Sequence, residues 1–294
     1  MTPESGLRNF FARSQQRAAS VCITGGDERP LRPRATEGRE ASKDTRCAAA
    51  RPFRAHIYHR ETMLMTKDSS DPGETQMVDS VVIWTLDWVP MPNGPAGFVR
   101  DLRLRWACEE AGLPYDVHTI PFEDRETNHL DRQPFGQVPY LDDGEVRMFE
   151  SGACLLHLAR KSEALMPRDP VGEAMALQWT MTALNSIEMV SVPWWFQEIT
   201  GAKENGLTGW LESRLAHMER VLSEREWLAV DRFTVADLAM ADVLRVKKVR
   251  SFGNRPATEA YISRVTDRPA FKKAYADQMA HFGAADAKRT RAQA

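Results

Sequence analysis

No stretch of the sequence reaches the roughly 18 consecutive apolar residues that a membrane-spanning helix needs. A transmembrane segment is therefore excluded, and no membrane partner is expected. Charge of one sign is not in excess either, because 39 Lys and Arg face 41 Asp and Glu. Without a basic surplus, we expect no nucleic-acid partner for the folded part. The composition, with 43% hydrophobic and 27% charged residues, is typical of a soluble globular protein.

Cysteine is also scarce, and the residues of this type lie far apart at Cys22, Cys47, Cys108 and Cys154. No pair has the spacing of a Cys-x-x-Cys redox motif or of a metal site. We therefore predict reduced thiols with structural roles, no metal cofactor and a cytoplasmic location. Cys154 is expected to pack inward from a helix rather than to react.

Residues 1–77 lack any sustained hydrophobic period and are rich in Arg, Ala, Ser, Gly and Pro. Such a segment buries too little apolar surface to fold, so we predict a disordered extension. A weak likeness to an amphipathic presequence and the internal Met63, Met65 and Met77 leave two alternatives open, a targeting segment or an over-extended start. Truncation to Val78 is expected to leave folding and ligand affinity nearly unchanged.

Residues 78–165 alternate between short apolar runs and helical periods. A strand, a helix and a second strand come first, which is the order of a parallel strand pair. A hairpin and a further helix follow, and this order predicts an α/β thioredoxin-like domain. The expected elements are strands at 81–86, at 115–120 and on both sides of Asp142-Asp143-Gly144, and helices at 98–111 and 153–161.

Beyond residue 170 only helical periods occur. Residues 170–282 are therefore predicted to form an all-helical domain, and residues 283–294 a C-terminal tail. The expected helices cover 171–200, 207–228, 235–249 and 257–276.

Three motifs occur in order: Pro134-Phe135-Gly136-Gln137-Val138-Pro139, Glu150-Ser151-Gly152-Ala153 and Phe233-Thr234-Val235-Ala236-Asp237-Leu238. Together they resemble the glutathione S-transferase superfamily over roughly residues 81–276. The resemblance implies a thioredoxin-like domain followed by a helical domain, glutathione as co-substrate, an apolar electrophile as acceptor, and a homodimer. In the third motif, Thr234 and Asp237 form a capping box that implies a structural role.

The first two motifs contain the groups expected to bind glutathione. A proline inside a strand removes a hydrogen-bond donor, so Val138-Pro139 is either an edge-strand trans proline or a cis peptide. The resemblance implies the cis form, with the Val138 backbone paired to the cysteinyl part of glutathione. Ser151 opens a helix, where a hydroxyl and the helix dipole suit a carboxylate. The resemblance implies that Ser151 and Glu150 hold the γ-glutamyl end and that Gln137 reaches the opposite end.

The residue that activates the thiol is missing from its usual place. Family members use a Tyr, Ser or Cys near the first helix, but the matching positions here are Phe98 and Val99. A substitute donor could come from the longer loop at 87–97 or from its flanks. The candidates are Thr85, Trp88, Asn93 and Arg100, of which Arg100 and Asn93 are our catalytic predictions.

The acceptor is expected between this loop and the first helix of the helical domain, against Trp88, Met189 and Trp194. Met and Trp at helical spacing also fit a protein core. Two other functions stay open. A glutathione-dependent reductase or isomerase would be favoured by a catalytic Cys in the first helix, and none is found there. A noncatalytic binding protein of this fold is consistent with the missing hydroxyl.

Overall fold

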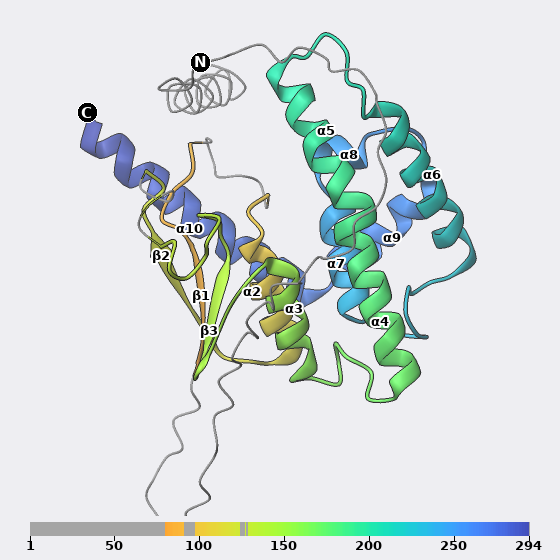
Figure 1. The fold of residues 1–294 in the computed structure, drawn as a ribbon, viewed down its shortest axis with the longest axis horizontal. Helices are drawn as coiled ribbons and strands as arrows, with labels where there is room; N and C mark the ends of the chain where they lie inside the picture. Colours follow the sequence, from red (N-terminus) through yellow and green to blue (C-terminus); the bar gives the residue numbers. More distant parts are fainter. Residues whose placement is uncertain (1–79, 91–97, 124–126, 128, 294) are drawn as a thin grey trace, which may run out of the picture. The chain divides into compact units, whose positions relative to one another are not determined.

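The computed structural model describes residues 80–90, 98–123, 127 and 129–293, all of which belong to one compact unit (Figure 1). The predictions made for residues 1–77 and for Asn93 lie outside these described residues. The domain limits 78–165 and 170–282 stay predictions. In the described part of the chain, no helix is long and apolar enough to cross a membrane.

One mixed sheet has the strand order β2-β1-β3-β4, from β1 (Val81–Leu86), β2 (Tyr115–Ile120), β3 (Tyr140–Asp143) and β4 (Val146–Phe149). β1 and β2 are parallel because a helix crosses over between them, whereas β3 pairs antiparallel with both β1 and β4. The tight β3–β4 turn is possible because Gly144 adopts a φ of 61°.

Two helices pack on one face of this sheet, α2 (Asp101–Ala111) and α3 (Ser151–Arg160). Ile83 of β1 and Leu141 of β3 are buried in the same core as the apolar side chains of these helices. Gly112 ends α2 in the left-handed conformation, with a φ of 65°. The predicted thioredoxin-like architecture is thereby confirmed.

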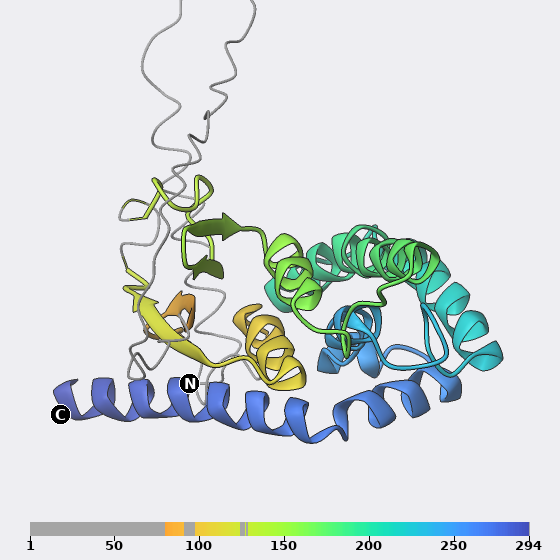
Figure 2. The same ribbon diagram turned by 90° about the horizontal axis from the view of Figure 1, so that it is seen from below.

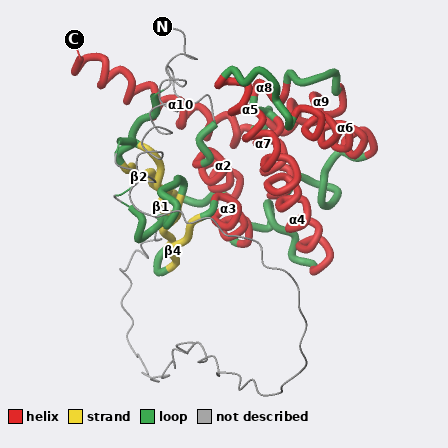
Figure 3. Tube along the Cα trace, turned by 45° about the horizontal axis from the view of Figure 1, so that its top comes forward, coloured by secondary structure: helices red, strands yellow, loops and turns green. Residues whose placement is uncertain are grey.

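The remaining chain is helical, and Figure 3 shows the strands confined to one part of the described structure. The stretch predicted as one helix at 171–200 is continuous but has a π-helical middle. The capping box of Thr234 and Asp237 is present at the start of a wholly buried helix, as predicted. The helices are α4 (Pro170–Thr182), η1 (Ala183–Glu188), α5 (Met189–Thr200), α6 (Thr208–Glu224), α7 (Val235–Leu244), α8 (Lys247–Arg250), α9 (Pro256–Thr266) and α10 (Pro269–Gln293).

The prediction of a single helix at 257–276 is wrong, because α9 and α10 are separate. Pro269 lacks an N–H and disfavours helical geometry in the residue before it, so the first helix ends and a second one begins at the proline. α10 then continues through residues 283–293, for which the sequence predicts a tail. Figure 2 shows α10, in blue, passing alongside α2 and on past the strands.

Candidate functional site

Three chain segments meet at one end of the strands. In the β-ladder, Tyr140 of β3 lies opposite Phe149 of β4 and opposite Trp84 of β1. Val138-Pro139 directly precedes Tyr140, and Glu150-Ser151 directly follows Phe149. The register therefore brings Val138-Pro139 and Glu150-Ser151 to the same end of the strands, beside the carboxyl end of β1.

The Val138-Pro139 peptide bond is cis. Pro139 is buried, Val138 is half-buried and Gln137 is exposed. Among the described residues, none forms a hydrogen bond with the Val138 backbone. The backbone N–H and C=O of Val138 are therefore available to an extended peptide.

Glu150 has an unusual backbone conformation, with a φ of 68° and a ψ of 112°. A residue with a side chain reaches this region only at a cost in free energy, and such residues cluster at binding sites. The Glu150 carbonyl accepts a hydrogen bond from the Cys154 N–H at 3.0 Å. This conformation turns the chain directly from β4 into α3 and places Ser151 in the first turn of the helix.

Ser151 contacts a buried arginine that the sequence analysis missed. The side chain of Arg103, on α2, donates from Nη1 to Ser151 Oγ at 3.3 Å. Ser151 itself is only 8% exposed. Because the hydroxyl oxygen accepts from Arg103, its own proton is free to point at a bound carboxylate. The arginine charge and the start of α3 both favour an anion at this position.

The Arg103 guanidinium is held by two acidic side chains. It donates to Glu188 of η1 at 2.6 and 3.1 Å and to Asp242 of α7 at 2.5 Å. Arg100 also pairs with Glu188 at 3.0 Å, and Arg245 pairs with Asp242 at 2.5 Å. Ser151 is thus linked to α2, η1 and α7 through buried charges.

The charges in this network stabilise one another. Burial acts to lower the pKa of Arg103, but the Glu188 and Asp242 charges outweigh it and raise that pKa above its ordinary value. Burial acts to raise the pKa of Glu188 and of Asp242, but the arginine charges outweigh it and hold both pKa values below their ordinary range. All three groups are therefore charged at neutral pH.

Aromatic rings of α5 contact the residue Phe98, which lies shortly before α2. Phe98 stacks on Trp195 of α5 with ring centroids 4.6 Å apart and meets Phe196 edge-on at 6.4 Å. No hydroxyl is offered by Phe98 or Val99. Thr85 is fully buried, and its Oγ1 has no hydrogen-bond partner among the described residues.

The structure does not bring the three predicted pocket residues together. Trp88 donates from Nε1 to Asp286 of α10 at 2.7 Å. Trp194 is 4% exposed and bonds to Thr208 within the helical part, which fits a core residue. Met189 is 52% exposed. The rings beside Phe98 belong to Trp195 and Phe196, the two residues that follow Trp194.

Neither described thiol is suited to react. Cys108 and Cys154 are fully buried and free, and burial raises the pKa of each to about 12. A thiol with so high a pKa is almost entirely protonated at neutral pH. The inward packing predicted for Cys154 is confirmed. In the described ranges, no cluster of three His, Cys, Asp or Glu could hold a metal ion.

Comparison with known proteins agrees with this architecture. The profile of the glutathione S-transferase N-terminal domain matches residues 96–160, and that of the C-terminal domain matches residues 193–278. Glutathione S-transferase 1 of Zea mays is 30% identical over 189 residues, which cover 58% of this chain and 88% of that protein. A glutathione S-transferase of Hyoscyamus muticus is 26% identical over 204 residues, covering 62% and 95%.

Solved structures show the same fold. A glutathione S-transferase-I bound with lactoylglutathione has a TM-score of 0.55 and 26% identity, covering 67% of this chain and 99% of that one. A Pseudomonas putida glutathione transferase with bound glutathione disulfide has a TM-score of 0.58 and 21% identity, covering 68% and 92%. This chain belongs to the glutathione S-transferase family. It is a glutathione transferase-like enzyme.

Proposed function

We propose that this enzyme holds glutathione along the sheet edge formed by Val138, Glu150 and Ser151 and transfers its sulfur to an apolar electrophile. The observation that carries the proposal is the Ser151 hydroxyl, set at the start of α3 and contacted by the buried Arg103 guanidinium at 3.3 Å. A hydroxyl donor backed by a fixed positive charge is suited to the γ-glutamyl carboxylate.

The positions that we propose for the rest of glutathione follow from the geometry at this end of the strands. The cysteinyl part of glutathione would pair with the Val138 backbone as a short added strand. Glu150 assists at the γ-glutamyl end, where its carboxylate can accept from the ligand's α-amino group. Gln137, exposed two residues before Pro139, is placed to reach the glycine end. The sulfur then points toward the end of β1 and the start of α2.

The reaction we propose is nucleophilic attack by the glutathione thiolate. The thiol loses its proton to solvent, the sulfur forms a bond to carbon, and a substitution substrate releases its leaving group. The enzyme must favour the thiolate over the thiol. Arg100 and Asn93 remain our candidates for this role, and Arg100 contributes positive charge in the residue directly before α2.

We propose that the acceptor lies against the ring cluster of Phe98, Trp195 and Phe196. Stacked aromatic side chains favour apolar and planar ligands. Met189 stays a candidate because its side chain is exposed at the start of α5. Trp88 and Trp194 stay predictions, and the burial of Trp194 favours a core role.

Two rival functions make different use of the same site. A reductase or isomerase that uses a cysteine finds no suitable thiol in the described part of the chain, because burial raises the pKa of Cys108 and of Cys154 to about 12. A noncatalytic glutathione-binding protein is favoured by one observation, the phenyl ring of Phe98 at the position where relatives carry the activating group. Turnover with an electrophile separates this rival from the transferase.

We also propose a homodimer in the cytoplasm. Exposed apolar side chains support a partner surface: Phe135 is 69% exposed, and Val146 and Met181 are also exposed. Burial of such apolar side chains by a second subunit would remove apolar surface from water, which is favourable. The proposed location follows from the reduced buried thiols.

The test is turnover with an aryl halide, together with the ultraviolet absorbance of the bound thiolate across pH. We expect conjugate formation above the uncatalysed rate and a bound thiol pKa below that of free glutathione. Binding without turnover or thiolate formation would favour the noncatalytic rival. No binding at millimolar glutathione would contradict the proposed site.

A further inference from the structure

A buried histidine contacts the backbone that leads into the cis Val138-Pro139 bond. His129 is 2% exposed, and its Nε2 lies 3.3 Å from the carbonyl oxygen of Gln137. Because a carbonyl oxygen can only accept a hydrogen bond, this contact requires the proton on Nε2. The Gln137 carbonyl belongs to the same peptide unit as the Val138 N–H, so His129 contacts the backbone that we propose pairs with glutathione.

The ring of His129 is itself held by aromatic stacking against the sheet. It lies on the ring of Tyr140 with centroids 5.8 Å apart and 18° between the ring planes. Tyr140 is the first residue of β3, and its ring stacks in turn on Trp84 of β1 at 5.5 Å. The sheet therefore fixes the position of the imidazole that contacts Gln137.

The chain between His129 and Gln137 is folded back by its own hydrogen bonds. The Gln133 N–H donates to the His129 carbonyl at 2.9 Å, and the Gly136 N–H donates to the Gln133 carbonyl at 3.0 Å. The Gln133 side chain is 1% exposed and accepts from the Phe135 N–H at 2.6 Å. These bonds return the chain on itself and bring the Gln137 carbonyl to the His129 ring.

We propose that His129 is a positioning residue for glutathione binding. The Gln137–Val138 peptide is trans, and the C=O and N–H of a planar trans peptide point in opposite directions. A hydrogen bond from His129 to the Gln137 carbonyl therefore sets the direction of the Val138 N–H. This N–H is the group that pairs with the cysteinyl part of glutathione, so the inference rests on the proposed function.

The expected effect of His129 is on binding and not on the reaction of the sulfur. The cysteinyl backbone pairs with Val138 in the same way before and during attack on the electrophile. A weaker pairing therefore costs the bound ground state and the transition state equally. Loss of such uniform binding raises KM and leaves kcat unchanged.

Two substitutions separate the N–H donor of His129 from its ring. His129→Phe keeps a ring that can stack on Tyr140 but removes the donor, whereas His129→Gln keeps an N–H donor and removes the ring. His129→Asn carries its amide on a side chain one methylene shorter than that of Gln. It replaces His129→Phe in the comparison if His129→Phe does not fold.

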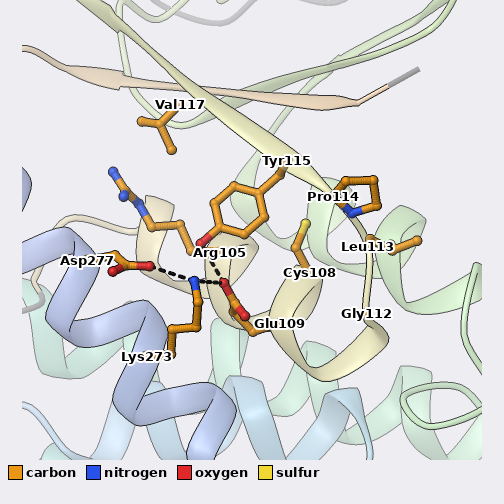
Figure 4. A pocket seen from close by; sticks show the side chains of 10 residues that line it. All are labelled: Arg105, Cys108, Glu109, Gly112, Leu113, Pro114, Tyr115, Val117, Lys273 and Asp277. Carbon is orange, nitrogen blue, oxygen red and sulfur yellow. Dashed lines mark hydrogen bonds and ion pairs between the residues drawn. The ribbon is translucent and has the colours of Figure 1, made fainter. Parts of the chain in front are cut away.

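Tyr115→Phe is the matched control, because it also removes one hydrogen bond from an aromatic side chain of the same domain. The Tyr115 hydroxyl donates to Glu109 at 3.0 Å, and Figure 4 shows it pointing at Glu109 in the pocket between α2, β2 and α10. Tyr115 pairs with Val81 at the first residues of β2 and β1. The control therefore lies at the opposite end of the strands from the proposed glutathione site.

The test measures the full-length wild type and each variant. The measurements are glutathione Kd by calorimetry, KM for glutathione and kcat with an aryl halide, and the melting temperature. We expect His129→Phe to raise Kd and KM by about fivefold, roughly the effect of one neutral hydrogen bond, while kcat changes by less than about twofold. His129→Gln and Tyr115→Phe should bind glutathione like the wild type.

An unchanged glutathione Kd in the folded donor-free variant would overturn the positioning role of His129 and leave the transferase intact. Equal losses of affinity in His129→Phe and His129→Gln would assign the effect to packing of the ring and would also overturn it. So would a loss in Tyr115→Phe as large as that in His129→Phe. A wild type that binds no glutathione would contradict the proposed function, and this inference with it.

Discussion

The two sides of the proposed glutathione site are built differently. On the carboxylate side, Ser151 is connected to Arg103, and Arg103 is held in turn by Glu188 and Asp242. On the side where we propose that the sulfur lies, Phe98 stacks on another aromatic ring. The difference leads us to expect that binding and activation can be changed separately by substitution. We propose that ligand anchoring depends on the buried charge network around Ser151, which has no counterpart beside Phe98 among the described residues.

Among the variants that test this comparison, we expect the largest effect from Arg103→Met. The substitution removes the group that Glu188 and Asp242 share, leaving each buried carboxylate with a single arginine partner. We expect the free energy of unfolding to fall by about 3 kcal/mol, measured by urea denaturation. Arg147→Met is the control, because Arg147 is 72% exposed and should change stability by less than about 0.5 kcal/mol. Equal losses in both variants would contradict a special role for the network.

Low pH should reduce the stability that the same charge network contributes to the fold. Because folding lowers the pKa of Glu188 and Asp242 below the ordinary values of 4.5 and 3.8, their contribution is fully present above those values. It is lost as pH falls through the lower, folded pKa values. Urea denaturation from about pH 7 to about pH 3 should show this loss. In Arg103→Met the dependence should be shallower, and an unchanged pH dependence would show that Arg103 does not set these pKa values.

The proposed role of the Phe98 position can be tested by placing a hydroxyl there. Phe98→Ser should lower the pKa of bound glutathione and raise kcat by roughly tenfold, about the value of one hydrogen bond to a charged group. Loss of the stacked contact with Trp195 should destabilise the protein by about 1 kcal/mol. Phe196→Ser tests the ring cluster without placing a hydroxyl at the family position. An equal gain in both variants would contradict the assignment of Phe98 to that position.

Much of the fold could be predicted because local signals agree with the tertiary structure. Gly112 and Gly144 stand where the chain needs a positive φ, and Thr234 with Asp237 forms the predicted capping box. The separation of α9 from α10 had a visible signal in Pro269, since a proline rarely continues a helix from the residue before it.

The buried charge network could not be predicted in the same way. Arg103 looks like a surface residue in an isolated helix, and its partners Glu188 and Asp242 lie 85 and 139 positions away. One signal was present: the α2 sequence alternates Leu, Arg, Leu and Arg, so no single face is apolar enough to be the only buried one. A helix covered on several sides requires partners for its charges.

The length of α10 escaped prediction for another physical reason. Its final turns carry few apolar residues, and they make polar contacts with chain segments outside the sheet, as in Asp286 with Trp88 and Arg289 with Glu123. Hydrophobic periodicity detects burial against a core but not hydrogen bonding to a distant segment. Fold and ligand motifs are thus readable from local sequence, while long-range polar partners are not.

The most direct test of the central claim is calorimetric titration of glutathione into the wild type and into Ser151→Ala. Ser162→Ala is the matched control, since the Ser162 hydroxyl accepts from the nearby Ala164 N–H at 3.3 Å. We predict measurable binding by the wild type, an affinity roughly tenfold weaker for Ser151→Ala, and no change for Ser162→Ala. Equal affinities in all three proteins would contradict the account, because glutathione would then be held without the Ser151 and Arg103 anchor.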